Sequence, residues 1–423
     1  MLELNTIKEK KEEVIERLAI KNINARQTIE KIIDLDTQRR ENQKKLDDAL
    51  AQANALAKEI GILFKSGKTT EANQLKEKTV QIKENSKQLE ASLTECIAQL
   101  NETLVQLPNL PHISVPAGKT AADNEIVYSE GSLPELPPNA MPHWDLTSKY
   151  DIIDFELGVK LTGAGFPVYK GKGARLQRAL VNFFLDEAIT AGYREIQPPL
   201  MINEASGYGT GQLPDKEGQM YYIGLDNLYM IPTAEVPVTN IYRDVILKVS
   251  DFPVKHVAYS ACFRREAGSY GKDVRGLNRL HQFDKVEIVQ IAHPDTSYQV
   301  LEEMRNHVAS LLQKLKLPFR IVKLCGGDMS FTSALTFDFE VFSAAQQKWL
   351  EVSSVSNFET FQANRMKLRF KDENGKTRLA HTLNGSALAL PRIVAALLEN
   401  NQTEKGILVP EILRPYTQFD IIN

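Results

Sequence analysis

The chain has 423 residues, of which 43% are hydrophobic and 25% are charged, and its formal net charge is −3 at pH 7. This composition is typical of a globular protein with more than one domain. The slightly negative net charge excludes a basic protein that binds nucleic acid over its whole surface. Three scattered cysteines exclude a disulfide framework and a zinc site, and no apolar stretch has the length of a membrane span. We therefore expect a cytoplasmic protein without a membrane partner, in which a local patch meets any nucleic acid.

Residues 1–107 contain no proline and are rich in lysine, glutamate, glutamine, alanine and leucine, a composition that favours helices. Two heptad series run through this region, with residues recurring at alternating spacings of four and three. The first series is Ile32, Asp36, Arg39, Gln43, Leu46, Leu50, Ala53, Ala57 and Ile60, and the second is Leu75, Thr79, Ile82, Ser86, Leu89, Leu93, Cys96, Leu100, Thr103 and Leu107. Turn residues at 65–70 separate the two series, so the pattern predicts an antiparallel coiled coil.

The coiled coil leaves two functions open. Helical hairpins of this kind are typical of dimerisation or of a spacer between domains. Three positions of the first series are polar, however, which a pure zipper would not favour. Lysines along the outer half of the hairpin would suit salt-sensitive contacts with nucleic-acid phosphates, and these are Lys44, Lys45, Lys65, Lys68, Lys76 and Lys78.

Repeated prolines mark a linker at 108–149, and from residue 150 onward aromatic and β-branched residues return. The patterns predict helices at Arg175–Ala191, Ser297–Leu315 and Pro391–Glu399, and strands at Val257–Phe263, Val286–Ile291, Phe319–Lys323, Phe337–Phe342 and Lys348–Val352. Strands in succession with grouped helices predict an α+β domain with an antiparallel sheet. The sequence has neither a GxGxxG nor a GxxxxGK[ST] loop, which argues against a Rossmann or P-loop nucleotide site.

Residues 263–287 are the most informative part of the chain. Two strand-like segments, Val257–Phe263 and Phe283–Val289, flank a loop with three glycines and three basic side chains, namely Gly268, Gly271, Gly276, Lys272, Arg275 and Arg279. Arginine makes bidentate contacts with phosphate, and glycine lets the backbone approach it closely. The carboxylates of Glu266 and Glu287 suit an ammonium or an adenine amino group. The hairpin therefore predicts a site for an amino acid and a nucleotide, and an exposed hairpin with solvated charges is the alternative interpretation.

Five segments in this order resemble the motifs of class II aminoacyl-tRNA synthetases. Residues 179–201 resemble motif 1, residues 257–289 motif 2 and residues 383–399 motif 3. Pro-Thr-Ala-Glu-Val-Pro at 232–237 resembles the serine-binding loop, and Glu-Val-Ser-Ser-Val-Ser-Asn-Phe at 351–358 resembles the strand for ATP and magnesium. The serine-type motif 3, Leu-Asn-Gly-Ser-Ala-Leu, identifies the chain as a member of the seryl-tRNA synthetase family, of bacterial type.

This resemblance implies a class II antiparallel sheet flanked by helices, with an N-terminal coiled-coil arm that binds tRNA. It places the arm at 1–107, the linker at 108–149 and the catalytic domain at 150–423, with motif 1 at the interface of a homodimer. The implied reaction activates L-serine with ATP and Mg²⁺ to seryl-adenylate and pyrophosphate, then transfers serine to tRNA(Ser), and whether tRNA(Sec) is also a substrate stays open. An inactive RNA-binding paralogue would show broken motifs, and a relative that loads a carrier protein would lack the arm.

The resemblance also assigns roles to single residues. The expected catalytic residues are Arg264, Arg392 and Glu351, and the expected metal ligands are Glu351 and Ser354. L-Serine is expected at Thr233, Ala234, Glu235, Glu287, Asn384 and Ser386, and ATP at Arg264, Arg265, Glu266, Phe283, Glu351, Val352, Ser353, Ser354 and Arg392. Contacts with tRNA are expected at Lys44, Lys45, Lys65, Lys68, Arg275 and Arg279. Taken singly, Phe283 could be a core residue, Ser386 a turn hydroxyl and Glu351 a surface ion-pair partner.

Overall fold

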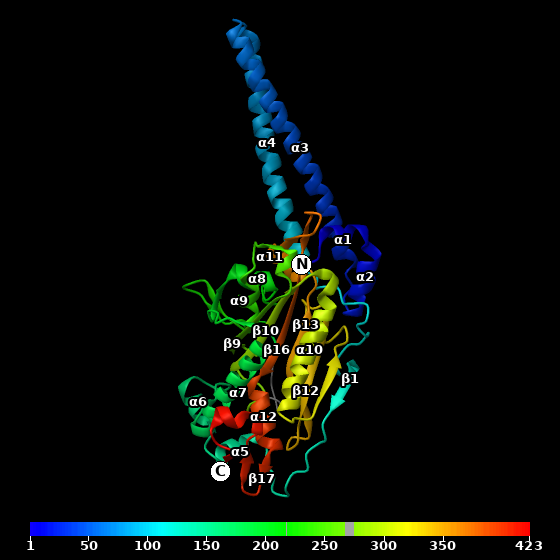
Figure 1. The fold of residues 1–423 in the computed structure, drawn as a ribbon. Helices are drawn as coiled ribbons and strands as arrows, with labels where there is room; N and C mark the ends of the chain where they lie inside the picture. Colours follow the sequence, from blue (N-terminus) through cyan, green and yellow to red (C-terminus); the bar gives the residue numbers. More distant parts are fainter. Residues whose placement is uncertain (217, 267–274) are drawn as a thin grey trace. The chain divides into compact units, whose positions relative to one another are not determined.

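A computed structural model describes residues 1–216, 218–266 and 275–423 (Figure 1). Two compact units make up the chain. One unit contains residues 2–19 and 23–108, and the other contains Met1, residues 20–22 and residues 109–423. Each unit is described by itself below.

The first unit is helical. Two short helices, α1 (Leu4–Glu9) and α2 (Lys11–Ile20), precede α3 (Arg26–Lys65) and α4 (Thr69–Leu104), which run antiparallel to each other (Figure 1). The side-chain amide of Asn42 donates to the hydroxyl of Ser92 at 3.3 Å, so these two positions face each other across the hairpin. With 40 residues at ~1.5 Å each, α3 is about 60 Å long. The coiled-coil prediction is confirmed, including the turn at 65–70.

The seam of α3 differs from the predicted series. Leu50 is 47% exposed, while Ala49 and Ala53 are buried, so the buried stripe has moved to the neighbouring position there. A straight helix has 3.6 residues per turn, and a strict 3.5-residue series drifts away from its buried face. Asp36 is buried as predicted for the seam, because Lys8 of α1 at 2.9 Å and Arg39 at 2.8 Å neutralise it. Burial raises the pKa of Asp36, but these two hydrogen bonds outweigh it and hold the pKa below its usual value.

An eight-stranded sheet forms the centre of the second unit. Its order is β1 (Glu125–Glu130), β11 (Phe319–Lys323), β12 (Leu335–Ser343), β13 (Lys348–Asn357), β16 (His381–Ala389), β10 (Gln282–Ala292), β9 (Val254–Phe263) and β4 (Arg194–Glu195). The neighbouring strands pair antiparallel except β4 and β9, which are parallel. The predicted α+β class with an antiparallel sheet is therefore confirmed.

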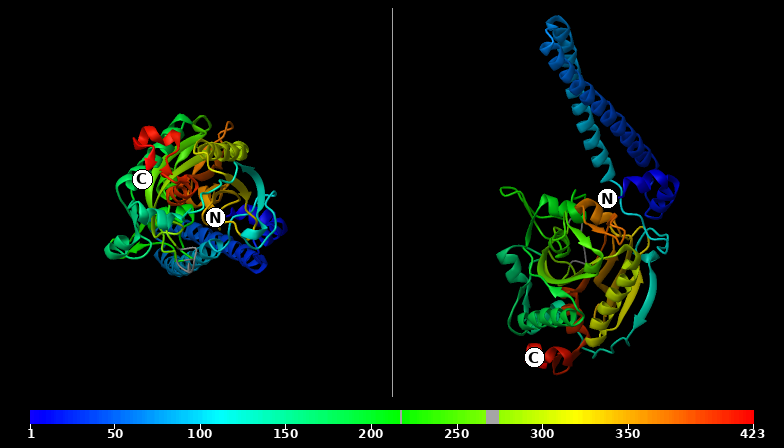
Figure 2. Two further views of the ribbon diagram at one scale, coloured as in Figure 1. Left: turned by 90° about the horizontal axis from the view of Figure 1, so that it is seen from below. Right: turned by 45° about the horizontal axis from the view of Figure 1, so that its top comes forward.

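Three long helices cover this sheet (Figures 1 and 2). They are α7 (Gly171–Thr190), which packs against β9 and β10, α10 (Ser297–Lys314), which packs against β13 and β16, and α12 (Leu390–Asn400), which packs against β10, β12 and β13. Each presents an apolar stripe, and Phe183, Phe184, Met304 and Ile393 are fully buried in one continuous core. All three helices were predicted within a few residues of their observed ends.

Shorter elements complete the second unit. They are α5 (His143–Lys149), β2 (Ile153–Asp154), α6 (Phe155–Leu161), β3 (Val168–Tyr169), β5 (Met201–Asn203), α8 (Glu204–Thr210), β6 (Tyr222–Ile223), β7 (Leu228–Met230), α9 (Glu235–Asn240), β8 (Ile246–Lys248), α11 (Phe361–Met366), β14 (Arg369–Lys371), β15 (Thr377–Leu379), β17 (Gln402–Thr403), β18 (Gly406–Leu408), α13 (Arg414–Thr417) and β19 (Ile421–Ile422). The predicted linker, 108–149, contributes the edge strand β1 and α5, and its boundaries as a separate segment stay a prediction. Among the described residues, no helix has the length and apolarity needed to cross a membrane.

Candidate active site

A cavity of about 530 Å³ opens over the strands at the middle of the large sheet. Antiparallel pairing sets Glu287 of β10 beside Ser386 of β16, and Gly385 of β16 beside Val355 of β13. Segments far apart in sequence therefore share one site. The cavity is lined by Gln212, Gln219, Pro232, Thr233, Glu235, Arg264, Glu266, Leu277, Asn278, Arg279, Leu280, Phe283, Lys285, Ser330, Thr332, Glu351, Val352, Ser353, Ser354, Phe358, Ser386, Ala389, Pro391 and Arg392.

One end of the cavity is acidic and buried. The side-chain amide of Asn384 donates to Glu235 at 2.9 Å and to Glu287 at 3.0 Å, so a single amide joins the two carboxylates. The hydroxyl of Thr233 donates to Glu287 at 3.1 Å and accepts the backbone N–H of Glu235 at 3.2 Å. Glu287 lies on β10, Asn384 lies on β16, Glu235 begins α9, and Thr233 precedes that helix by two residues. Four of the residues expected at L-serine therefore form one network.

The pKa of the buried Glu235 carboxyl is raised above its usual value. Burial raises its pKa to about 7, and the nearby negative charge of Glu287 adds to the effect. The side chain of Gln362 donates to Glu235 at 2.7 Å and opposes the shift. Without a bound cation, this carboxyl therefore exchanges its proton close to neutral pH.

The raised pKa predicts a pH-dependent stability. Because the folded protein holds the Glu235 proton more tightly than the unfolded chain, whose value is near 4.5, the free energy of unfolding falls as pH rises between the two values. We expect urea unfolding without ligands to show this fall in the wild type and not in Glu235→Gln. The free energy of unfolding of the wild type, relative to that of Glu235→Gln, should fall by roughly 2.5 kcal/mol between pH 5 and pH 8. Parallel pH profiles for the two proteins would contradict the assignment.

Lys285 is a site residue that the sequence interpretation missed. Lys285 lines the cavity, and its ammonium donates to the hydroxyl of Thr233 at 2.9 Å and forms an ion pair with Glu287. Side chains two apart on a strand share a face, and Phe283, Lys285 and Glu287 alternate along β10. That alternation was the available signal. Gln212, Gln219 and Thr332 lie in loops of the cavity wall, and no motif pointed to them.

The other end of the cavity is rich in arginine. The guanidinium of Arg264 lies 5.2 Å from the centre of the Phe283 ring, a cation–π distance. Arg392 donates through Nε to the carbonyl of Asn278 at 3.0 Å and through Nη1 to the carbonyl of Glu351 at 2.6 Å. Glu266 pairs with Arg279 at 2.6 Å. The ring of Phe283 and the side chains of Arg264 and Arg392 therefore line the same end of the cavity.

The carboxylate of Asp338 lies close enough to Glu351 for their charges to interact. Asp338 of β12 pairs in register with Ser354 of β13, and its buried Oδ1 has no hydrogen-bond partner among the residues that the structure describes. Burial raises the pKa of Asp338 well above its usual value, and the charge of Glu351 adds to this, although Ser354 donates a hydrogen bond that lowers it. Two carboxylates whose charges repel each other, with one buried oxygen left over, fit a hard cation. The described residues contain no group of three or more His, Cys, Asp or Glu side chains with metal-site geometry.

Some expected residues lie elsewhere. Ala234 is fully buried in a small apolar cluster, and Arg265 lies 5.8 Å from the ring of Tyr221; neither lines the cavity. Ser353 lines the cavity, but its hydroxyl donates to the carbonyl of Ser386 at 2.6 Å and so links β13 to β16. Glu287 and Asn384 sit behind the lining residues. Gly268, Gly271 and Lys272 lie outside the described residues.

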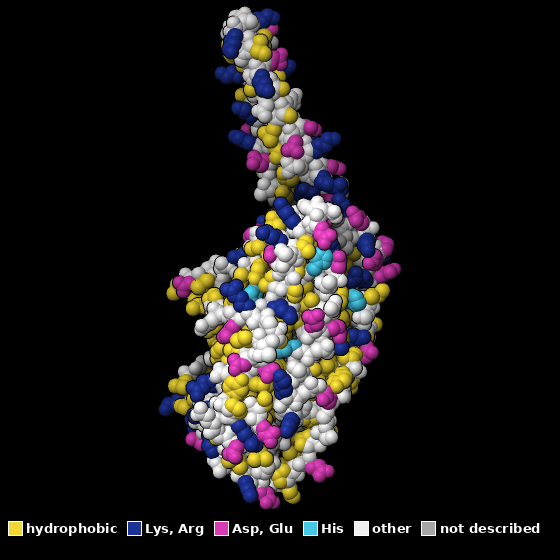
Figure 3. All heavy atoms as spheres, viewed as in Figure 1, with side chains coloured by type: hydrophobic (Ala, Val, Ile, Leu, Met, Phe, Trp, Pro, Cys, Tyr) yellow, Lys and Arg dark blue, Asp and Glu magenta, His cyan; other side chains and the backbone are white. Residues whose placement is uncertain are grey.

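The residues expected at tRNA are exposed. Lys44, Lys45, Lys65 and Lys68 of the arm are all at the surface, and Lys68 lies 3.3 Å from Glu71. Lys and Arg side chains occur along the arm on the face drawn in Figure 3, with Asp and Glu between them. Mixed charge of this kind weakens a purely electrostatic attraction to phosphate but leaves local basic pairs available.

Comparison with known proteins covers both units. A family model described as the seryl-tRNA synthetase N-terminal domain matches residues 1–111, and one described as the tRNA synthetase class II core domain (G, H, P, S and T) matches residues 223–401. The serine–tRNA ligase of Salinibacter ruber is 51% identical to this chain, over 99% of this chain and 98% of that protein. That of Pelodictyon phaeoclathratiforme is 45% identical, over 100% and 99%.

Solved structures agree with these relatives. The crystal structure of seryl-tRNA synthetase from Pyrococcus horikoshii complexed with ATP superposes with a TM-score of 0.92 at 32% identity, over 100% of this chain and 99% of that one. The serine–tRNA ligase from Naegleria fowleri in complex with AMP gives 0.88 at 25% identity, with the same coverage. The similarity in sequence and in fold extends over the whole length of the relatives, and the antiparallel sheet carries the cavity described above. The chain therefore belongs to the seryl-tRNA synthetase family of class II aminoacyl-tRNA synthetases.

Proposed function

We propose that this chain is a serine–tRNA ligase, which activates L-serine with ATP and transfers the serine to the 3′-terminal adenosine of tRNA(Ser). One observation carries the proposal: the same cavity has a buried acidic end and an arginine-rich end with an aromatic face. The first end suits an amino acid, and the second suits a nucleotide. The residues on which the family resemblance rests are present, so nothing favours an inactive paralogue.

At the acidic end, the proposed contacts of serine follow from charge and size. The ammonium of serine would lie between Glu235, Glu287 and Thr233, where it competes with Lys285 for the Glu287 carboxylate. The hydroxyl of Ser386 is the group proposed to read the serine hydroxyl. A site that hydrogen-bonds a substrate hydroxyl rejects an analogue without it by ~10⁴–10⁵, because its own polar groups are left unpaired. Alanine is the analogue excluded in this way, and threonine is excluded by its extra methyl group.

This assignment predicts the effect of Ser386→Ala. The KM for serine in serine-dependent exchange should rise by ~10-fold or more, because a buried hydrogen bond to the substrate is lost. The KM for ATP should change much less, since Ser386 lies on the amino-acid side. Steady-state exchange at varied serine and varied ATP measures both constants. An unchanged serine KM would remove Ser386 from the proposed serine contacts.

At the arginine-rich end, ATP is proposed to bind with its adenine between Phe283 and Arg392. Stacking and cation–π attraction both favour that position. Arg264 would contact the α-phosphate, and Glu266 would accept the adenine amino group. Arg265 lies outside the cavity wall, so its proposed contact with ATP has the weaker geometric support.

The residues around Glu351 fit Mg²⁺. Glu351 and Ser354 line the cavity, and Asp338, which pairs with Ser354, has a buried oxygen without a partner in the described part of the chain. Mg²⁺ is commonly held by one or two carboxylates together with substrate phosphates and water, which agrees with this small set. When bound, the ion would neutralise negative charge that develops on the phosphates.

The chain's own residues act by positioning. The serine carboxylate attacks the α-phosphorus in line, forming the P–O bond of seryl-adenylate while pyrophosphate leaves. No side chain has to take a proton in that step. Arg264 and Arg392 stabilise the charge of the transition state, and the acidic end holds the ammonium so that the carboxylate faces the phosphate. The adenosine hydroxyl of the tRNA then attacks the seryl carbonyl, and AMP leaves.

The tRNA is proposed to meet the coiled-coil arm through its exposed lysines and the hairpin through Arg275 and Arg279. Sequence-blind phosphate contacts would supply most of that affinity. Binding of tRNA(Sec), a homodimer built through motif 1 and a cytoplasmic location belong to the same proposal.

Exchange of pyrophosphate into ATP tests the function directly. Purified full-length protein with Mg²⁺ is assayed with each of the twenty amino acids in turn. Exchange with serine alone supports the proposal and shows that the site is intact. Folded protein that gives no exchange with any amino acid would overturn it.

A further inference from the structure

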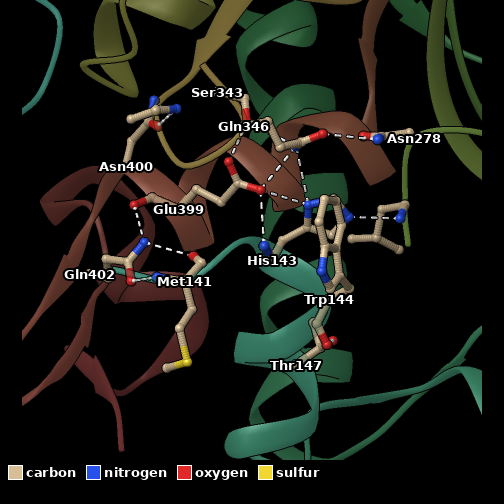
Figure 4. A network of polar contacts seen from close by, with 12 residues as sticks. Met141, His143, Trp144, Thr147, Asn278, Ser343, Gln346, Glu399, Asn400 and Gln402 are labelled. Carbon is tan, nitrogen blue, oxygen red and sulfur yellow. Dashed lines mark hydrogen bonds and ion pairs between the residues drawn. The ribbon is translucent and has the colours of Figure 1, made fainter. Parts of the chain in front are cut away.

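A closed ring of hydrogen bonds lies beside the cavity, among residues to which no role has been given (Figure 4). Glu399 of α12 accepts from Nδ1 of His143 at 2.7 Å and from the amide of Gln346 at 2.9 Å. Nε2 of His143 accepts the backbone N–H of Leu277 at 2.9 Å. The amide of Asn278 donates to Gln346 at 3.0 Å. Because Leu277 and Asn278 are consecutive, the ring closes through the backbone.

A buried charge orients this ring. Glu399 and His143 are both fully buried, and the carboxylate also accepts the backbone N–H of His143 at 2.9 Å and the hydroxyl of Ser343. Burial raises the pKa of Glu399, but the hydrogen bonds from His143 and Ser343 outweigh it, and the pKa lies below its usual value. An ionised Glu399 accepts a hydrogen bond from the protonated Nδ1, which leaves Nε2 without a proton as the acceptor for the Leu277 N–H.

The ring is connected to the nucleotide end of the cavity. Leu277 and Asn278 line the cavity, and the carbonyl of Asn278 accepts from Arg392 at 3.0 Å. Arg392 and Glu399 lie about two turns apart on α12, hence on one face and roughly 10 Å apart. The two ends of one helix therefore hold two consecutive residues of the cavity wall.

Helix α5 reinforces the same segment at two neighbouring positions. Gly276 has a φ of +66°, and a side chain there would place its Cβ 2.2 Å from Nε2 of His143, so the close approach requires glycine. The guanidinium of Arg275 lies 4.6 Å from the centre of the Trp144 ring. Residues 275–278, which we name the return limb, are thus held by His143 at Gly276 and Leu277 and by Trp144 at Arg275.

We propose that His143, held by Glu399, is a positioning residue for ATP: it fixes the return limb and, through Asn278, the guanidinium of Arg392. This inference rests on the proposed function, since it concerns the nucleotide end of the same cavity. His143 touches no substrate and acts through Leu277. Serine binds at the other end of the cavity, next to Glu287 and Ser386, and does not depend on the return limb.

Two replacements separate the roles of the two imidazole nitrogens. In His143→Gln the amide oxygen takes the place of Nε2 and accepts the Leu277 N–H, while the side-chain contact with Glu399 is lost. In His143→Asn the amide nitrogen takes the place of Nδ1 and donates to Glu399, while the Leu277 N–H loses its acceptor. Each variant keeps one of the two contacts, and both replacements are amides smaller than the imidazole. Melting temperatures are measured for both.

Calorimetric titration of the full-length proteins with ATP gives the affinity, and exchange kinetics give KM for ATP and for serine. His143→Asn should bind ATP ~10-fold more weakly, because the buried N–H of Leu277 loses its acceptor and the limb is displaced. Its KM for serine should stay within about threefold, whereas its kcat should fall together with its ATP affinity, since Arg392 also stabilises the transition state. His143→Gln should bind ATP nearly as the wild type does.

Two results would overturn the inference. ATP affinity that follows the melting temperatures of the two variants, or that is unchanged in His143→Asn, would mean a structural role only. A wild-type protein that binds no ATP would overturn the proposed function along with it, so the two failures are told apart by the first titration.

Discussion

Replacing residues 43–91 by a short glycine–serine loop should leave serine-dependent exchange unchanged and lower the rate of tRNA charging by ~100-fold or more. Asn42 and Ser92 face each other at 3.3 Å, so a short loop can join the two helices there and keep the base of the hairpin. The deletion removes the outer lysines, and contacts between such lysines and phosphates dominate affinity for nucleic acid. Steady-state aminoacylation and pyrophosphate exchange on the same preparation measure the two steps separately.

The shortened arm also decides between the two functions that the heptad pattern left open. A dimerisation coiled coil would lose its partner when shortened, and the mass measured by light scattering would fall to that of the monomer. A tRNA-binding arm would leave the mass unchanged. Charging at the full rate by the shortened protein would show that the arm is not where tRNA binds.

Arg264→Gln should lower kcat/KM for serine-dependent exchange by ~10²–10³. Arg264 lies against the ring of Phe283 at the nucleotide end, with its Nε donating to the carbonyl of Pro232 at 3.4 Å. Removing one preorganised charge that stabilises a phosphoryl transition state typically costs a factor of this size. Glutamine keeps the length and polarity of the side chain, so the change in charge is the main effect.

Arg265→Gln is the matched control, because the two arginines are neighbours with the same charge. The guanidinium of Arg265 lies at Tyr221 outside the cavity, and we expect its replacement to change exchange by less than about threefold. Equal losses in both variants would mean that Arg265 also contacts ATP, as the sequence resemblance implied, and that its side chain moves when ATP binds.

The architecture could be read from the sequence because it rests on periodicity. The turn at 65–70, the helices at 175–191 and 297–315 and the strands around the hairpin all follow from apolar spacing and breakers. The seam of α3 could not be read in full, since a strict heptad series misplaces Leu50 and the burial of Asp36 depends on Lys8 in another helix. Pairing between distant charges leaves no local pattern.

The site was only partly predictable for the same reason. Arg264, Phe283, Glu351 and Arg392 stand in motifs and do line the cavity. Lys285 was within reach through strand alternation, but Asp338 enters only because β12 pairs with β13. His143 becomes important only once α5 is seen against the far end of α12. Contacts of this kind arise from tertiary structure, which a single sequence does not encode locally.

The strand order has a consequence for how the protein is made. β16 lies between β13 and β10 in the sheet, yet it is the last of the long strands in the chain. During synthesis, β9, β10, β12 and β13 leave the ribosome before the strand that joins their two halves exists. Pairings across such sequence distances form slowly, because loop closure precedes any gain from contacts. With the serine and ATP contacts proposed above, the two substrates stabilise only a chain completed beyond residue 392. Substrate binding would then report on a finished fold and would offer no support to a nascent one.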